Sequence, residues 1–202
     1  MKKFTFFMSV AALACGMMLV SCNKDEKDDN GGGNTNNLPT TIDENFDNGI
    51  PSSWTVIDAD GDGHVWMASA ANFQNPCGVD GTECAASASY TNSDGVLNTD
   101  NYLVSPKIYV KDGATLTYQV TNYQSEYPDQ YSVMLGTVEN GTFKAIATLV
   151  TERVSTGYYD GDGAYTAKSF NLSEYKGKEV CVAFRHNDSD AYWLLIDNVK
   201  VQ

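Results

Sequence analysis

Residues 114–120 read ATLTYQV, and apolar and polar residues alternate along this stretch. Leu116, Tyr118 and Val120 are apolar or aromatic, and a polar residue stands between each pair of them. Because successive side chains of a β-strand point to opposite faces of a sheet, this alternation predicts a strand with one buried face. The preceding Lys-Asp-Gly, at residues 111–113, is typical of a turn.

Five further stretches towards the C-terminus also have strand patterns. They are rich in β-branched and aromatic residues, which favour strands. Turn clusters of Gly, Asn, Asp and Lys separate them, and short strands at this spacing indicate a β-sandwich or a β-barrel. Too few segments have helical periodicity for a fold of alternating strands and helices. The stretches are YSVMLGT from Tyr131, FKAIATLV from Phe143, AYTAKSFNL from Ala164, EVCVAFRH from Glu179 and WLLIDNVKV from Trp193.

The composition limits the kind of protein and the kind of partner. The chain has 202 residues, a length typical of one domain, and 42% of them are hydrophobic, which is enough to build a core. Its formal net charge is -13. This charge argues against nucleic acid as a partner, because phosphate binding needs a basic face. An acidic surface is compatible with cations and with neutral glycans.

The first 21 residues have the features of a secretory signal peptide. Lys2 and Lys3 supply positive charge, and an apolar run follows from Phe4 to Val20. The run ends in LVSC, which resembles a bacterial lipobox and implies cleavage before Cys22 and lipid attachment to that cysteine. The alternative is a plain transmembrane anchor, although the run is short for a span of about 20 residues.

Residues 22–40 are predicted to be the lipidated cysteine and a flexible linker, since the stretch is acidic and rich in Gly and Asn. Asn23 follows the sorting rule of lipoproteins sent to the outer membrane, and the charged run at 24–29 resembles an export signal for the outer surface. The run could also be only a solvated tether. We expect an outer-membrane lipoprotein exposed on the cell surface, held to the membrane through lipid alone, with a folded domain at 41–202.

Three cysteines fall within the expected domain. Cys77 and Cys84 bracket a Gly-containing turn and could close as a disulfide in an oxidising compartment. Cys181 lies in the apolar run VCVAF and is expected to be a buried free thiol. No spacing of Cys and His indicates a zinc site.

The stretch DADGDGH, at residues 58–64, is a candidate calcium loop. Asp58, Asp60 and Asp62 reproduce the start of an EF-hand loop, and calcium binds six to eight oxygens. The twelfth position of such a loop needs a bidentate Glu, and here it is Ser69, so the loop is not an EF-hand. A calcium loop of another kind and a solvated polar turn both remain open.

A second acidic stretch, DGDG at residues 160–163, has the composition of a turn. Its glycines permit left-handed backbone, which favours a hairpin turn between two strands. Metal binding is the alternative.

Catalysis has little support in the sequence. The chain has only two histidines, His64 and His186, and both are expected to form hydrogen bonds in a loop or at a strand end. Neither a G-x-S-x-G nucleophile motif nor a zinc-protease HExxH motif is present. The separation of two carboxylates for glycoside hydrolysis cannot be judged without a structure. We predict that the protein is not an enzyme and has no catalytic residues.

Three stretches carry a family resemblance: ENFDNGIPSSWTVIDADGDGHVW at 44–66, NTDNYLVSPKI at 98–108 and EYKGKEVCVAFRHNDSDAYWLLIDNVKV at 174–201. In this order they resemble the cleaved-adhesin, or choice-of-anchor J, family, best known from the adhesin modules attached to gingipain proteases. The resemblance implies a jelly-roll β-sandwich of two antiparallel sheets, related to MAM and carbohydrate-binding folds. It also implies structural calcium and adhesion rather than catalysis. This chain carries one module and no protease, which leaves its binding targets open.

The resemblance further implies a calcium site where the first and last strands of the domain meet. Glu44 and Asp47 stand at the start of the domain, and Asp197 stands in the last strand after three apolar residues. A buried carboxylate is costly unless it is paired or bound to metal. The alternatives are that Asp197 accepts backbone N–H bonds or that it pairs with Arg185.

Tyrosines beside loops are candidates for a ligand-binding surface. Exposed aromatic side chains can stack on sugar rings or anchor a protein interface. Each of them could instead pack at the edge of the core, and Trp54 and Trp66 are expected to lie in the core. The candidates are Tyr123, Tyr127, Tyr158, Tyr159 and Tyr192.

These observations predict a cell-surface lipoprotein with an adhesin-like, calcium-stabilised module that binds a glycan or a host or matrix protein. The alternative is a non-catalytic accessory or structural subunit of a larger outer-membrane complex. A glycan-active enzyme is the third and least supported class.

Overall fold

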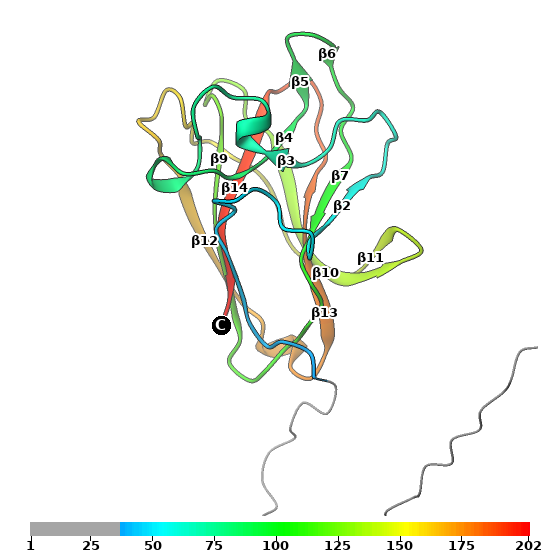
Figure 1. Ribbon diagram of the computed structural model, residues 1–202. Coiled ribbons are helices and arrows are strands. Elements are labelled where there is room, and N and C mark those ends of the chain that lie inside the picture. Colours follow the sequence, from blue (N-terminus) through cyan, green and yellow to red (C-terminus); the bar gives the residue numbers. More distant parts are fainter. Residues whose placement is uncertain (1–36) are drawn as a thin grey trace, which may run out of the picture. The chain divides into compact units, whose positions relative to one another are not determined.

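The computed structural model describes residues 37–202, which form a sandwich of two antiparallel β-sheets (Figure 1). The predicted signal peptide at 1–21, the lipidation site Cys22 and most of the linker at 22–40 lie outside the described residues. In the part of the chain that is described, no helix is long and apolar enough to cross a membrane.

Each sheet has six strands. The first has the order β12–β9–β14–β4–β3, with β1 also beside β14, and the second has the order β11–β10–β13–β7–β2, with β8 also beside β13. The strands of the first sheet are β1 (Ile42–Glu44), β3 (Met67–Ala68), β4 (Ala85–Ala88), β9 (Thr115–Asn122), β12 (Thr166–Asn171) and β14 (Trp193–Val201). Those of the second are β2 (Thr55–Asp58), β7 (Asn101–Val104), β8 (Ile108–Tyr109), β10 (Gln130–Glu139), β11 (Thr142–Arg153) and β13 (Glu179–His186). The remaining elements are the hairpin of β5 (Tyr90–Thr91) and β6 (Gly95–Val96) and the 3-10 turns η1 (Ser69–Ala71), η2 (Val79–Gly81) and η3 (Ser173–Tyr175).

All six stretches with strand patterns form strands. The boundaries of β13 and β14 coincide with the predicted runs EVCVAFRH and WLLIDNVKV. In β9, Leu116, Tyr118 and Val120 are buried, while Thr117 and Gln119 are half-buried, as the alternation requires. The all-β prediction and the two-sheet jelly roll are confirmed.

The chain changes sheet at most connections, which gives the sandwich its jelly-roll winding. One exception is the β10–β11 hairpin, where Asn140 and Gly141 have φ of 50° and 76°, as a tight two-residue turn requires. The predicted hairpin turn at 160–163 is wrong, because β11 and β12 lie in different sheets and this segment belongs to the loop that crosses between them. Asp160 holds this loop by accepting the backbone N–H of Ser125 at 3.1 Å.

The main core lies between the two sheets. Its central contact joins the hydroxyls of Tyr118 and Tyr131, 2.8 Å apart, and the Tyr131 hydroxyl also lies within hydrogen-bond distance of Glu152, at 2.7 Å. Trp54 and Trp66 are buried in the same core, as expected. Apolar burial on this scale is the main favourable term in the stability of such a domain.

β14 is buried on both faces, because a second apolar cluster covers the outer face of the first sheet. Leu194 and Ile196 point into the sandwich, whereas Trp193 and Leu195 point outward into the second cluster. The segment at 69–84 folds over this outer face and supplies residues to the cluster. The strand is thereby fixed from both sides.

The cysteines of the domain are buried free thiols in the structure. This confirms the expectation for Cys181. The possible disulfide between Cys77 and Cys84 is not formed here; both lie in the outer apolar cluster. Burial raises the pKa of Cys77 to about 11 and that of Cys84 to about 12, so both thiols stay protonated at neutral pH.

Candidate functional site

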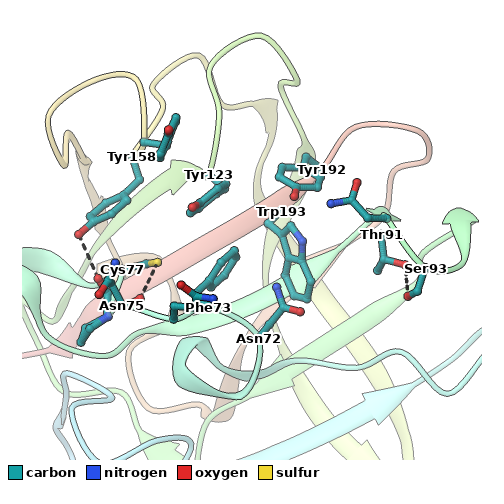
Figure 2. Close-up of a pocket in the computed structure, with 14 residues that line it drawn as sticks. Asn72, Phe73, Asn75, Cys77, Thr91, Ser93, Tyr123, Tyr158, Tyr192 and Trp193 are labelled. Carbon is teal, nitrogen blue, oxygen red and sulfur yellow. Dashed lines mark hydrogen bonds between the residues drawn. The ribbon is translucent and has the colours of Figure 1, made fainter.

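Figure 1 shows the loops at one end of the sandwich, opposite the end that holds the C-terminus. Among these loops a groove lies on the outer face of the first sheet. Its central pocket has a volume of about 620 Å³. Figure 2 shows this pocket, with Tyr158 on one side and Tyr192, Thr91 and Ser93 on the other. The lining residues are 72–77, 91–93, 123, 158–159 and 192–193.

Two smaller pockets continue the central one. A pocket of about 540 Å³ shares Tyr158 and Tyr159 with it, and a pocket of about 400 Å³ shares Asn92 and Tyr192. The three pockets therefore adjoin through these shared residues, and we treat them as one site. We call it the aromatic groove.

Aromatic rings pack against one another along the centre of the groove. Phe73 stacks on Tyr123 with ring centroids 4.5 Å apart, and Trp193 meets Phe73 edge-on at 5.3 Å. Tyr123 also stacks on Tyr159 at 5.7 Å and contacts Tyr192 edge-on at 5.8 Å. Tyr159 is 69% exposed, so a large part of its ring is free for a ligand.

The five tyrosines singled out from the sequence meet at this groove. Tyr123, Tyr158, Tyr159 and Tyr192 line the central pocket, and Tyr127 lines the smallest pocket with its ring 6.3 Å from that of Tyr192. They belong to three connections that are distant in the sequence, β9–β10, β11–β12 and β13–β14. The jelly-roll winding brings these connections to the same end of the sandwich (Figure 1).

A buried polar network lies beneath these loops. His186, the last residue of β13, has Nε2 2.9 Å from Asp129 Oδ1 and Nδ1 2.9 Å from Ser87 Oγ. The Ser89 hydroxyl donates to Asp129 Oδ1 at 2.6 Å, and the Tyr192 N–H donates to Asp129 Oδ2 at 3.3 Å. Both carboxylate oxygens of Asp129 therefore have partners, and they connect the end of β13 to the residue before β5 and to the β13–β14 loop.

The network contains a serine, a histidine and an aspartate in contact, but it is not arranged for hydrolysis. Ser87, His186 and Asp129 have no exposed surface, so a substrate carbonyl has no path to the serine oxygen. We assign the three residues a structural role. His186 forms hydrogen bonds at a strand end, as expected from the sequence.

Asn122, at the end of β9, extends the network to the loop between β11 and β12. Its Oδ1 accepts the Asp129 N–H at 3.0 Å, and its Nδ2 donates to the carbonyls of Val154 at 2.8 Å and Thr156 at 3.1 Å. The Tyr158 N–H donates to the Asn122 carbonyl at 2.8 Å. One side chain and its own backbone thus hold two loops of the groove.

The acidic loop after β2 gathers three carboxylates. One oxygen each from Asp58, Asp60 and Asp62 lie within 4.8 Å of one another. Asp58 accepts the N–H groups of Gly61 at 2.7 Å and Gly63 at 3.0 Å, which is the behaviour of a polar turn. Burial, together with the charges of its two neighbours, raises the pKa of Asp60. The loop forms a tight turn and also presents the hard oxygen ligands that calcium prefers.

Asp197 projects from the outer face of β14 and is 1% exposed. It accepts the Val79 N–H at 2.8 Å and the Asn198 N–H at 2.6 Å, so the backbone alternative considered for it is present. Burial, and then the negative charges of Asp47 and Asp80, raise the pKa of Asp197 to about 6. The negative charges of two other carboxylates therefore act on the buried Asp197.

The other alternative for Asp197, a pair with Arg185, is wrong. The Arg185 guanidinium instead makes two hydrogen bonds to Asp100, at 2.6 Å and 2.8 Å. Glu44 accepts the Phe46 N–H at 2.9 Å, and its strand β1 pairs with β14. The first and last strands lie together, as the resemblance implied.

Residues 39–201 match the Cleaved Adhesin Domain family. The chain belongs to this family. Hemagglutinin A of Porphyromonas gingivalis is 36% identical over 186 residues, which cover 86% of this chain and 7% of Hemagglutinin A. Lys-gingipain W83 of the same organism is 34% identical, over 79% of this chain and 10% of its own. The chain thus spans a small part of the length of these relatives.

Solved structures agree with the membership of this cleaved adhesin domain. The K1 cleaved adhesin domain of Lys-gingipain from P. gingivalis W83 is similar with a TM-score of 0.68 and 30% identity, covering 81% of this chain and 98% of the K1 chain. TmCBM61, solved in complex with β-1,4-galactotriose, has a TM-score of 0.52 and 10% identity, covering 79% of this chain and 94% of its own. The second likeness concerns the fold alone.

Several groove residues of this cleaved adhesin domain carry no clear signal in the sequence. The side chains of Asn72, Gln74 and Asn75 line one wall, but they lie in a segment without periodicity, where amides are common. Phe73 in the same segment looks like an isolated apolar residue. Trp193 begins a strand of apolar residues; its buried side chain belongs to the outer apolar cluster and borders the groove.

Replacing Asp129 with Ala should lower the free energy of unfolding by about 3–5 kcal/mol, because His186, Ser89 and the Tyr192 N–H lose a buried acceptor. Chemical denaturation followed by tryptophan fluorescence measures the change. Glu126→Ala, at an exposed carboxylate in the same loop, is the control and should stay within about 0.5 kcal/mol of the parent. An equal effect of the two substitutions would show that the network does not hold the loops.

Proposed function

We propose that this protein is a non-catalytic binding module of the adhesin type that is displayed on the cell surface and binds a glycan or an extracellular protein through the aromatic groove. The observation that supports this proposal is the meeting of Phe73, Tyr123, Tyr159, Tyr192 and Trp193 at one uncharged pocket. Aromatic side chains supply large contact areas with little loss of conformational entropy.

Contacts within the groove hold its walls in place before a ligand binds. The Tyr158 hydroxyl donates to the Pro76 carbonyl at 3.1 Å, and the Tyr165 hydroxyl donates to the Cys77 carbonyl at 2.8 Å. These bonds tie the β11–β12 loop to the wall at 72–77. A site that is already ordered loses less entropy on binding, which favours affinity.

The N-terminal sequence supports display at the cell surface. A signal peptide at 1–21 and the lipobox-like ending LVSC would place lipid on Cys22, and the acidic linker would separate the lipid from the domain. We therefore propose an outer-membrane lipoprotein whose module faces outward.

Structural calcium is proposed at the junction of the first and last strands. Asp197 is buried, and the charges of Asp47 and Asp80 act on it. A bound calcium ion would relieve this repulsion, and Glu44, on the strand that pairs with β14, could add another oxygen. The acidic loop after β2 is proposed as a second calcium site. In both places the ion would strengthen the fold rather than take part in chemistry.

Tyr159→Ala should reduce adhesion about tenfold, because it removes the most exposed ring of the groove. The measurement is retention under flow of beads coated with the purified protein on a surface of extracellular matrix. Ile146→Ala is the matched control, since Ile146 is 57% exposed on the edge strand β11 and should not contribute. If both variants adhere like the parent, the groove is not the binding surface. Absence of adhesion, with one stoichiometric partner recovered from the same cell surface, would favour an accessory subunit.

Cys22→Ala should release the protein from the membrane fraction, because no lipid can then be attached. Cell fractionation followed by immunoblotting measures this, and protease treatment of intact cells reports the face on which the domain lies. Cys181→Ala changes a buried thiol of the domain and should leave the membrane association intact. Membrane retention of the Cys22 variant would contradict the anchor, and protection of the parent until the outer membrane is broken would place the domain in the periplasm.

Calcium should raise the melting temperature by about 5 °C at neutral pH, and the gain should shrink as the pH falls through about 6. The folded-state pKa of Asp197 is raised above its ordinary value of 3.8, so the cost of the ionised form is fully present above about pH 6 and disappears towards pH 4. Calcium binds the ionised carboxylate of Asp197. It can therefore offset the free-energy cost of burying that charge only above about pH 6.

Differential scanning calorimetry in calcium and in EDTA, at neutral pH and again at a pH below about 6, tests this expectation. Asp47→Asn should weaken the calcium response, and Asp60→Asn separates the contribution of the loop after β2. Asp112→Asn is the control, since this exposed carboxylate pairs with Lys176 at 2.9 Å. A melting temperature of the parent that ignores calcium at neutral pH would reject structural calcium.

A further inference from the structure

We infer that the aromatic groove is built for an extended, electrically neutral glycan that places at least one sugar unit in each of its three pockets. This inference rests on the proposed function and names the class of ligand. It starts from the shape of the site. Three adjoining pockets of about 400 to 620 Å³ are each in the size range of small-ligand sites, and their continuity suits a chain rather than a compact molecule.

The rings offer faces suited to sugars. Tyr159 and Tyr127 are 69% and 45% exposed, and each lies against another tyrosine of the groove, which fixes its orientation. The C–H faces of a pyranose ring are apolar and can stack on such rings, while its hydroxyls remain at the edge. Exposed rings at separated points along the groove give a chain of sugars more than one stacking site.

Amide side chains between the rings match the hydroxyls of a sugar. Asn72, Gln74, Asn75 and Asn92 line the central pocket, and Gln124 lines the smallest. Among residues 37–202, none of these five side-chain amides forms a hydrogen bond. An amide has both donors and acceptors, as sugar hydroxyls do, so each can bond a neutral hydroxyl without a charge.

The distribution of charge excludes acidic glycans. No charged residue lines the central pocket, and no Lys or Arg lines any of the three. The only charged residues of the outer pockets are Asp80 and Asp162 at one end and Asp190 at the other. A uronate, sialate or sulfate would meet these carboxylates and the chain's net charge of -13 without a compensating cation.

The surface is less suited to a protein partner. Specific protein interfaces bury about 800 Å² on each partner around a central apolar or Arg-containing cluster. In the described part of the chain only four large hydrophobic residues are exposed, and two of them are the groove tyrosines. The groove is concave and rich in amides, which fits a small polar ligand better than a flat protein face.

The experiment is isothermal titration of the purified protein with two matched series of increasing length, linear galactose oligosaccharides and oligogalacturonates. Neutral glucose and mannose series are run beside them, since the groove does not fix the sugar stereochemistry. We expect a neutral series to bind with an affinity that rises until the three pockets are filled. At equal length, the acidic series should bind at least about tenfold more weakly.

Variants tie the binding to the groove. Tyr159→Ala should weaken binding of the neutral chain about tenfold, and Asn92→Ala should weaken it by a smaller factor. Ile146→Ala, on β11, should bind like the parent. Both groove positions are exposed, so circular dichroism should show unchanged folding. If the parent and Tyr159→Ala bind the neutral chain equally, the groove assignment is overturned.

A parallel arm uses matrix glycoproteins before and after enzymatic removal of their glycans. Loss of binding after deglycosylation supports the inference. Unchanged binding that Tyr159→Ala abolishes would overturn the glycan class but leave the proposed binding module standing. Preference for the acidic series would overturn the charge argument. No binding in any arm would overturn both the inference and the proposed function.

Discussion

The buried carboxylate of Asp129 connects the sandwich to the loops that form the aromatic groove. Its two oxygens meet His186 from the second sheet, Ser89 from the start of the β5–β6 hairpin and the backbone of Tyr192. Buried polar groups have strong geometric demands, because each lost partner is expensive in a medium of low dielectric. The positions of the groove tyrosines therefore depend on contacts that no ligand touches. The buried hydrogen bonds beneath the groove loops restrict the motion of these loops. The aromatic rings of the groove are therefore held in one packing arrangement.

The strand β14 carries residues of both candidate sites, the aromatic groove and the proposed calcium site at Asp197. The side chains of β14 alternate, so Leu194 and Ile196 hold it in the main core while Trp193, Leu195 and Asp197 face outward. The outward row begins at the groove and ends at the buried carboxylate, about 13 Å further along at strand spacing. A cation at Asp197 would act on the same rigid element that carries the groove floor. If calcium binds there as proposed, this arrangement would let it influence binding in the groove without contact with the ligand.

The parts of the structure that follow from local pattern could be predicted, and the parts that depend on contacts between distant segments could not. Alternation in ATLTYQV and the apolar run WLLIDNVKV predicted β9 and β14, because burial acts on each strand directly. The jelly-roll winding came from the family resemblance. The wrong hairpin at 160–163 shows the limit: its glycines do indicate a turn, but only the sheet order shows that the flanking strands never pair. The outward face of Trp193 was equally hidden, since it depends on the segment that folds over the first sheet.

The negative charges of the chain are distributed unevenly, and they leave the central pocket of the groove uncharged. Carboxylates gather in the loop after β2 and around Asp197, whereas the central pocket has none. A domain with net charge -13 gains nothing from long-range attraction to the anionic surfaces of cells. In the proposed module, contacts with a ligand would then come from stacking and hydrogen bonds. These interactions act at short range, so the ligand must match the shape of the groove and the spacing of its side chains. The aromatic and amide lining supplies both kinds of contact. In the proposed binding module, the negative charge would slow the first encounter with an anionic surface, and the fit of the groove would then select the ligand.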